Sequence, residues 1–155
     1  MEKRVFHNVI WDFLDDMPIE RDDFNNAVIA KQFFNFNNSD NWDPNEIIIH
    51  KPKVIISYRT MMCSQEGIYD NEKVIKLEQF TLPEELGEDD DLLFGTIYAT
   101  LEADNKEDFL ALELLYKLHK QLLNKNSMTH LYFDGLEINK QPKNKYDYLM
   151  HFDFG

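Results

Sequence analysis

Residues 106–124 read KEDFLALELLYKLHKQLLN. Leucine recurs at every fourth position of this stretch, which places one apolar stripe along an α-helix. The leucines of the stripe are Leu110, Leu114, Leu118 and Leu122. Asp104 or Asn105 can cap the beginning of such a helix. Glu113 precedes Lys117 by four residues, the order that favours an ion pair on a helix. The sequence therefore predicts a long helix here, and the segments around it decide the class of fold.

The segments on both sides of this helix are rich in β-branched and aromatic residues, which favour strands. Turn-forming residues interrupt them, as at residues 42–45, at Pro52 and at Gly67. A further turn-like pair, Asp134-Gly135, lies inside the first segment after the helix. The sequence predicts six strands, over Glu46–His50, Lys53–Met62, Lys73–Leu82, Leu92–Glu102, His130–Asn139 and Lys145–Phe154.

Two further helices are predicted near the N-terminus. Apolar residues over 5–17 follow a helical spacing, although a strand over residues 4–11 is an alternative. Asp22 or Asp23 can cap a second helix, which the asparagine-rich stretch after Phe36 ends. The first of the two helices would turn three carboxylates toward water, those of Asp12, Asp15 and Asp16.

This order of elements indicates the fold class. Helices are segregated from a run of strands that short turns connect, which is typical of α+β proteins. We expect a mainly antiparallel sheet of five to six strands with about three helices packed on one face. No internal repeat or linker divides the chain, so residues 1–155 are expected to form a single globular domain.

The charge of the chain is strongly negative, with 29 acidic and 16 basic side chains and a formal net charge of −13. A direct nucleic-acid binder needs a basic surface that replaces the counterions of phosphate, and anionic membranes repel an acidic protein. We therefore expect no direct contact with nucleic acid or membrane. The first residues contain no secretory signal, and a lone cysteine, Cys63, cannot form an internal disulfide. These features predict a cytoplasmic protein.

The sequence carries no motif that predicts catalysis. The five histidines, among them His119 on the predicted polar flank of the long helix, lack the spacing of zinc ligands. No serine lies in a nucleophile elbow, and no glycine-rich loop could hold a phosphate. Asp89–Asp91 are consecutive, whereas a calcium loop alternates its acids. We expect no catalytic residue, cofactor or metal, although a nucleophilic Cys63 or a carboxylate pair stays an alternative.

Acidic clusters with aromatic residues near them in the sequence are the remaining signal. Dense like charges repel one another, so such clusters can serve to attract a cationic partner, although a solvated acidic surface is the alternative. Exposed aromatic rings among carboxylates are typical of tight interfaces. Trp11, Phe33, Phe34 and Phe36 also lie near the clusters, and we expect most of these rings in the core. The candidate partner-binding residues are Asp12, Asp15, Asp16, Asp22, Asp23, Trp42, Glu84, Glu85, Glu88, Asp89, Asp90 and Asp91.

In its size, its single cysteine, its missing export signal and its acidic stretches 12–23 and 84–91, the chain resembles the small acidic immunity proteins of bacteria. Those proteins neutralise the toxins of contact-dependent and other polymorphic systems. The resemblance implies a 1:1 complex with a cognate basic toxin domain, often a nuclease, covered at its active site or an adjacent surface. The alternatives are a nucleic-acid-mimicking anti-defence protein, a small enzyme, or an interaction subunit that forms a homodimer through a strand edge.

Overall fold

The computed structural model describes residues 4–6, 8–13, 20–62, 68–80, 92–122, 132–141, 143 and 145–153. These residues form two helices and two sheets, which confirms the α+β class. The helices are α1 (Arg21–Phe36) and α2 (Ala111–Leu122). The strands are β1 (Arg4–Val5), β2 (Ile47–Ile49), β3 (Lys53–Met62), β4 (Glu72–Phe80), β5 (Leu92–Glu102), β6 (Phe109–Leu110), β7 (Tyr132–Ile138) and β8 (Tyr148–Asp153).

The larger sheet is mixed, in the order β1-β7-β8-β3-β5-β4. Five strands of ordinary length form most of it, and β1 adds only two residues at one edge. The strand β8 runs parallel to β3, with Ile56 opposite Tyr148, and every other pairing in the sheet is antiparallel. The expectation of a mainly antiparallel sheet therefore has to be refined, because the last strand returns to the middle of the sheet. The small sheet pairs β2 with β6.

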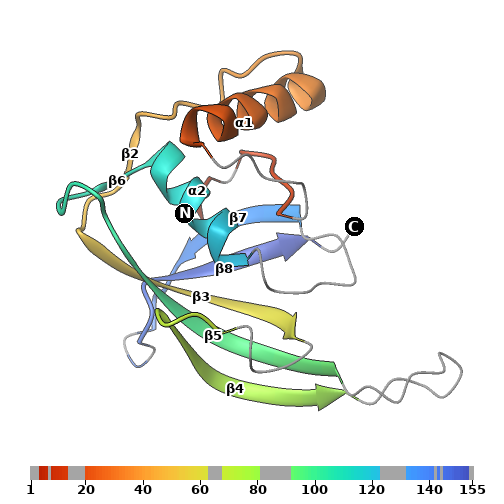
Figure 1. Ribbon diagram of the computed structural model, residues 1–155, viewed down its shortest axis with the longest axis vertical. Helices are drawn as coiled ribbons and strands as arrows, with labels where there is room; N and C mark the ends of the chain where they lie inside the picture. Colours follow the sequence, from red (N-terminus) through yellow and green to blue (C-terminus); the bar gives the residue numbers. More distant parts are fainter. Residues whose placement is uncertain are drawn as a thin grey trace, which may run out of the picture.

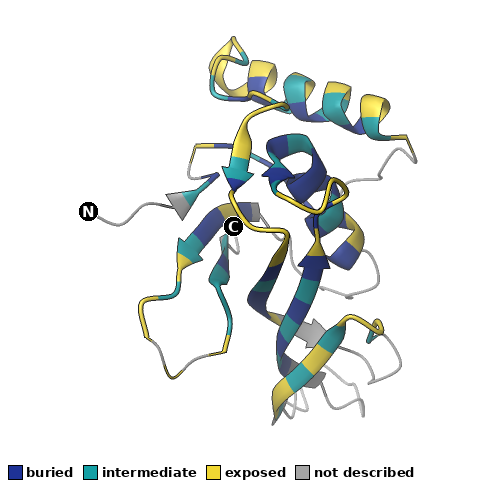
Figure 2. Ribbon diagram, turned by 90° about the vertical axis from the view of Figure 1, so that its left-hand side faces the viewer, coloured by how far each residue is buried: buried dark blue, intermediate teal, exposed yellow. Residues whose placement is uncertain are grey.

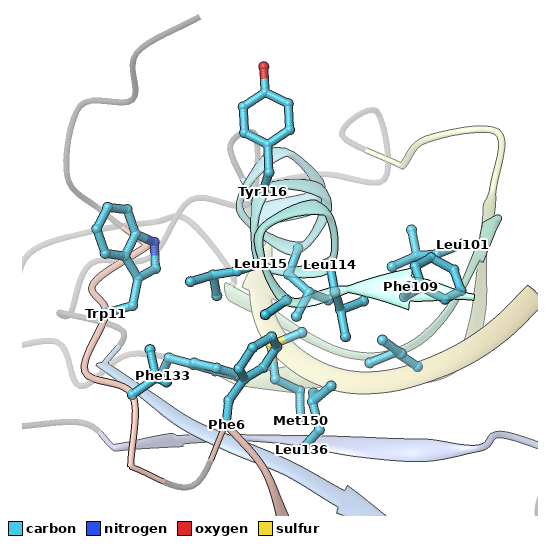
Figure 3. Packing of buried hydrophobic residues seen from close by; sticks show 14 of the residues in the cluster. Phe6, Trp11, Leu101, Phe109, Leu114, Leu115, Tyr116, Phe133, Leu136 and Met150 are labelled. Atoms are coloured by element: carbon cyan, nitrogen blue, oxygen red, sulfur yellow. The ribbon is translucent and has the colours of Figure 1, made fainter. Parts of the chain in front are cut away.

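The helices form two layers above one face of the sheet. Figure 1 shows α2 lying across the sheet and α1 lying above α2, farther from the strands. Leu114 points from α2 toward Leu136 and Met150 of the sheet, Leu115 points to the side on which Trp11 lies, and Tyr116 points away from the sheet (Figure 3). All these side chains are buried. Because α2 is covered from both sides, it forms the centre of the core.

The helix α2 begins later than the sequence predicts. The side chain of Asn105 behaves like a helix cap, since its Oδ1 accepts hydrogen bonds from the backbone N–H groups of Glu107 and Asp108, at 2.8 and 2.9 Å. The next two residues nevertheless form strand β6 opposite β2. The helix starts at Ala111, whose N–H donates to Glu46 O at 2.8 Å. Asn105 therefore closes a local turn, and tertiary pairing with β2 decides the conformation that follows.

The predicted helix over residues 5–17 is wrong for the residues that the structure describes. Arg4–Val5 pair with β7, so the alternative strand holds for these two residues only. Phe6 has φ of 64°, which interrupts regular structure. A non-helical segment then carries Val9, Trp11 and Phe13 into the core. Apolar residues at helical spacing can therefore also occur in a segment that is buried but not helical.

The other predicted elements are confirmed with shifted ends. The helix α1 begins at Arg21, and its N-cap is Glu20 without a side-chain hydrogen bond, so the predicted caps are wrong. Its C-cap, Asn37, has the left-handed φ of 62°. The Asp134-Gly135 pair forms no hairpin turn, because Gly135 (φ 88°) lies inside β7 where the pairing with β8 shifts register. No helix among the described residues is both long and apolar enough to cross a membrane.

Candidate partner-binding surface

The outer face of α1 exposes three aromatic rings. Phe33 is 51% exposed, Phe34 87% and Phe36 43%. The opposite face of the helix carries Phe24, Val28 and Gln32, which are buried. Scattered exposed apolar residues are normal, but three exposed phenylalanines within four positions concentrate apolar surface at the end of this helix, and we call these three residues the aromatic patch. Packing against the described residues does not account for these exposed rings.

The N-terminal end of the same helix is acidic. Asp22 and Asp23 lie in its first turn and are exposed. Neither carboxylate forms an ion pair with another residue in the described part of the chain. Their position stabilises the helix, because carboxylates interact favourably with the positive end of the helix dipole. They also leave a negative surface in the same element as the aromatic patch.

Buried polar contacts hold α1 in place. Gln32 Nε2 donates to Ile10 O at 2.7 Å and to Val28 O at 3.0 Å, and its Oε1 accepts from Ile10 N at 3.0 Å and from Asn41 Nδ2 at 2.9 Å. The indole N–H of Trp42 donates to Asn25 Oδ1 at 2.8 Å. Gln32 is completely buried and uses both polar atoms of its amide. The loop after α1 is thereby fastened to the helix, and the outer face keeps its direction.

Two cations of the helices, Arg21 of α1 and Lys117 of α2, are paired with carboxylates. Lys117 Nζ lies 2.9 Å from Asp104 Oδ1 and 2.8 Å from Glu113 Oε2, as the sequence spacing of Glu113 and Lys117 predicts. Arg21 pairs with Asp104 at 2.6 Å. Hydrogen bonding by Lys117, with a smaller contribution from Arg21, holds the pKa of Asp104 below its ordinary value. Cations in or beside the strands are also paired, in Lys51–Asp147, Lys53–Glu102, Arg59–Glu78 and Lys76–Glu78.

A cleft of about 490 Å³ lies between the edge strand β1, the 41–50 segment and the beginning of α2. Its apolar lining includes Phe6 and Trp42, whose ring centroids are 6.2 Å apart at an interplanar angle of 30°. The polar part of the lining includes Asp43, Glu46 and Tyr148. A volume of this size with a mainly apolar wall and a few polar groups is typical of a binding pocket.

The partner-binding candidates named from the sequence lie in different environments, some exposed and some buried. Asp22 and Asp23 are exposed on α1, whereas Asp12 is buried at 5% exposure, so the expectation that it faces water is wrong. The cause is that residues 8–13 do not form the predicted helix. Trp42 is buried at 7% exposure and reaches the cleft. The remaining candidates lie outside the described residues: Asp15, Asp16, Glu84, Glu85, Glu88, Asp89, Asp90 and Asp91.

The sequence did not point to every residue of this surface. Phe33, Phe34 and Phe36 lie close to the acidic clusters in sequence, but we expect most aromatic residues to be core, and only the structure separates the exposed rings from the buried ones. Asp43 and Glu46 were not candidates. They come together with Phe6 and Tyr148 only through tertiary contacts.

Among the residues that could support catalysis, His119 is completely buried, so its predicted place on a polar flank is wrong. It follows Leu115 by four residues, which puts it beside the leucine stripe. The indole N–H of Trp11 donates to its Nδ1 at 2.8 Å, and the rings of Phe13 and Phe24 pack against it. This environment is that of a core histidine.

Metal binding and nucleophilic catalysis receive no further support from the described residues. No group of three or more His, Cys, Asp or Glu side chains in those ranges could hold a metal ion. Cys63 lies outside the described residues. Comparison of the chain with protein-family models, with curated proteins and with solved structures finds no match.

Proposed function

We propose that this chain is a non-catalytic acidic binding protein that acts as an immunity protein. It forms a 1:1 complex with a cognate basic toxin domain and covers the active site of that domain or a surface beside it. The single observation that carries the proposal is the outer face of α1, where exposed phenylalanine rings follow carboxylates that have no cation partner among the described residues.

The two ends of this face suit two stages of association. Carboxylates at Asp22 and Asp23 would attract a cationic surface and raise the association rate. Phe34 would then be buried in the partner, and aromatic residues at the centre of an interface slow dissociation. The net charge of −13 extends the attraction beyond direct contact.

The same face favours a protein partner over mimicry of nucleic acid. A mimic needs carboxylates in long rows that imitate the spacing of phosphates. The outer face of α1 carries Asp22 and Asp23 at one end only, and Phe33 and Phe34 occupy the other. A phenyl ring contributes to binding when it enters an apolar pocket, which a protein surface can supply.

The first experiment uses a candidate partner, the C-terminal domain of the protein encoded by the adjacent reading frame, if that domain is basic. Its expression in bacteria should stop growth, and coexpression of this chain should restore it. Association is then measured with the purified domain at low and at moderate salt. Asp22→Asn with Asp23→Asn should slow association severalfold at low salt, and the difference should shrink as salt rises.

Phe34→Ala should instead raise the dissociation rate, by about tenfold or more, because truncating a central aromatic residue costs at least ~1.4 kcal/mol in many interfaces. The matched controls are exposed residues in other parts of the fold, Asp70→Asn with Glu107→Gln for charge and Ile75→Ala for apolar surface. These controls should bind like the unaltered chain. Failure to restore growth, or equal affinity of all variants, would contradict the proposal.

A further inference from the structure

The cleft beside β1 has the chemistry of a site for one basic side chain. Its wall combines the stacked rings of Phe6 and Trp42 with the carboxylates of Asp43 and Glu46. We propose that this cleft binds an arginine side chain of the partner protein. The inference deepens the proposed function, on which it rests, by assigning a second contact with its own ligand.

The wall is held by contacts that do not involve a ligand. Glu46 O accepts the N–H of Ala111 at 2.8 Å, and Pro44 O accepts the N–H of Leu112 at 3.1 Å. Trp42 is fixed from the other side by its hydrogen bond to Asn25. Because both helices hold this segment, the rings and carboxylates are positioned before a ligand enters, which lowers the entropy lost on binding.

The electrostatics of the cleft favour a cation. Asp43 and Glu46 are exposed and form no ion pair with any residue that the structure describes. The beginning of α2 borders the cleft and contributes a positive partial charge of about one half, which two carboxylates exceed severalfold. The first two N–H groups of α2 also donate to backbone carbonyls already. An anion would therefore meet a net negative wall.

Arginine fits this wall better than lysine does. A guanidinium group is planar, so it can stack on an aromatic ring while its N–H groups bind carboxylates, whereas an ammonium group is a strongly hydrated point charge. Burial raises the pKa of Tyr148 above its ordinary value of 10.0, so the phenol on this wall stays neutral and leaves the negative charge to the two carboxylates.

The second large cavity, of about 580 Å³, is a poor alternative for the same ligand. It lies between β5, residues 70–71 and α2, and Lys117 and Lys120 line it. Its lining contains no aromatic ring, and Lys120 Nζ is already 4.5 Å from the centre of the neighbouring Tyr116 ring. Only one of these two cavities combines aromatic rings with carboxylates that lack a cation.

The test is an NMR titration of the chain with N-acetyl-arginine methylamide at about pH 8. The cleft is also lined by His50, and imidazole side chains ordinarily carry no charge at this pH. The chain has two tryptophans, so the indole N–H of Trp42 reports on the cleft and that of Trp11, bonded to His119, serves as an internal control. The Trp42 signal should shift with a millimolar Kd, and the Trp11 signal should stay. The citrulline analogue, which has nearly the same shape without the charge, should bind at least about tenfold more weakly.

Asp43→Asn with Glu46→Gln should weaken binding of the arginine compound about fivefold or more, and Asp70→Asn with Glu107→Gln should leave it unchanged. The asparagine at position 43 preserves the acceptor that now bonds Asn45 N at 3.0 Å, so the turn is maintained. An unmoved Trp42 signal, equal binding of citrulline, or tighter binding of the lysine analogue would overturn the inference.

The outcome separates this inference from the proposed function. If the arginine compound does not bind while Phe34→Ala still weakens the toxin complex, the cleft assignment is wrong and the binding function stands. If the compound binds in the cleft but no variant affects growth or the toxin complex, the proposed function is wrong. If the compound binds in the cleft and Phe34→Ala weakens the toxin complex, Asp43→Asn with Glu46→Gln should also weaken that complex.

Discussion

The two helices of this protein use their apolar residues differently. The helix α2 buries nine of its twelve residues, whereas α1 buries three of sixteen and leaves Phe34 87% exposed. In Figure 2, α2 is mostly dark blue, while α1 alternates between buried, intermediate and exposed positions. The fold requires the leucines of α2. The outer phenylalanines of α1 are exposed, which is why we propose that face for binding.

The charges of the two helices differ in the same way. On α2, Glu113 and Lys117 form an ion pair that also includes Asp104. On α1, Asp22 and Asp23 have no such partner among the described residues. Charges that are paired within the chain contribute to its own structure, and charges left without a counterion add to the external field. The comparison can be tested by variants that act on one helix at a time.

The largest effect is expected in the core of α2. Leu114→Ala should lower the free energy of unfolding by about 2–5 kcal/mol, since the side chain is completely buried and its loss leaves a cavity. Phe34→Ala on α1 should change it by no more than about 0.5 kcal/mol, because the ring is exposed. Urea unfolding followed by circular dichroism measures both. A loss of stability for Phe34→Ala as large as that for Leu114→Ala would show that the outer face of α1 is structural.

A smaller loss is expected when α1 is detached from the N-terminal segment. Gln32→Met conserves volume and removes the four hydrogen bonds that the amide forms, so the backbone N–H and C=O of Ile10 lose their partner. The free energy of unfolding should fall by about 1–3 kcal/mol. Hydrogen exchange at the Ile10 amide should accelerate more than exchange in α2. Equal acceleration in both places would mean that α1 does not open separately.

Much of the fold could be predicted where local signals and packing agree. The strands β3 and β5 match their predicted bounds, and α1 and most of α2 lie where the apolar spacing places them. Local preferences fail where a tertiary pairing competes. The side chain of Asn105 forms a hydrogen bond that is typical of a helix cap, yet pairing with β2 makes Phe109 and Leu110 a strand. The parallel pairing of β8 with β3 joins residues about ninety positions apart, which no local pattern encodes.

The candidate surface was predictable only in part. The acidity of Asp22 and Asp23 is visible in the sequence, and so is their place at the start of a helix. Helical spacing alone could not show that Phe34 is exposed, because that depends on which face of α1 meets α2. The buried contacts of Gln32 decide this orientation, and an isolated polar residue on a helix is ordinarily read as exposed.

The smallest expected effect concerns the ion pairs that join the two helices. Asp104 contacts Arg21 at the start of α1 and Lys117 on α2, and these partners lower its pKa in the folded state. The folded protein therefore binds fewer protons at Asp104 than the unfolded chain does. This contribution is complete above the ordinary value of 3.8 and is lost as the pH falls through the lower folded value.

Asp104→Asn should consequently reduce stability near pH 7 by less than about 1 kcal/mol, because the carboxylate is half exposed and solvent screens the pair. The difference between the variant and the unaltered chain should shrink toward zero as the pH falls well below 3.8. Asp70→Asn, which removes an exposed carboxylate outside the helices and without a cation partner among the described residues, is the matched control for removal of charge. A difference for Asp104→Asn that persists undiminished in acid would mean that packing or the backbone, and not the ion pairs, connects the two helices at this point.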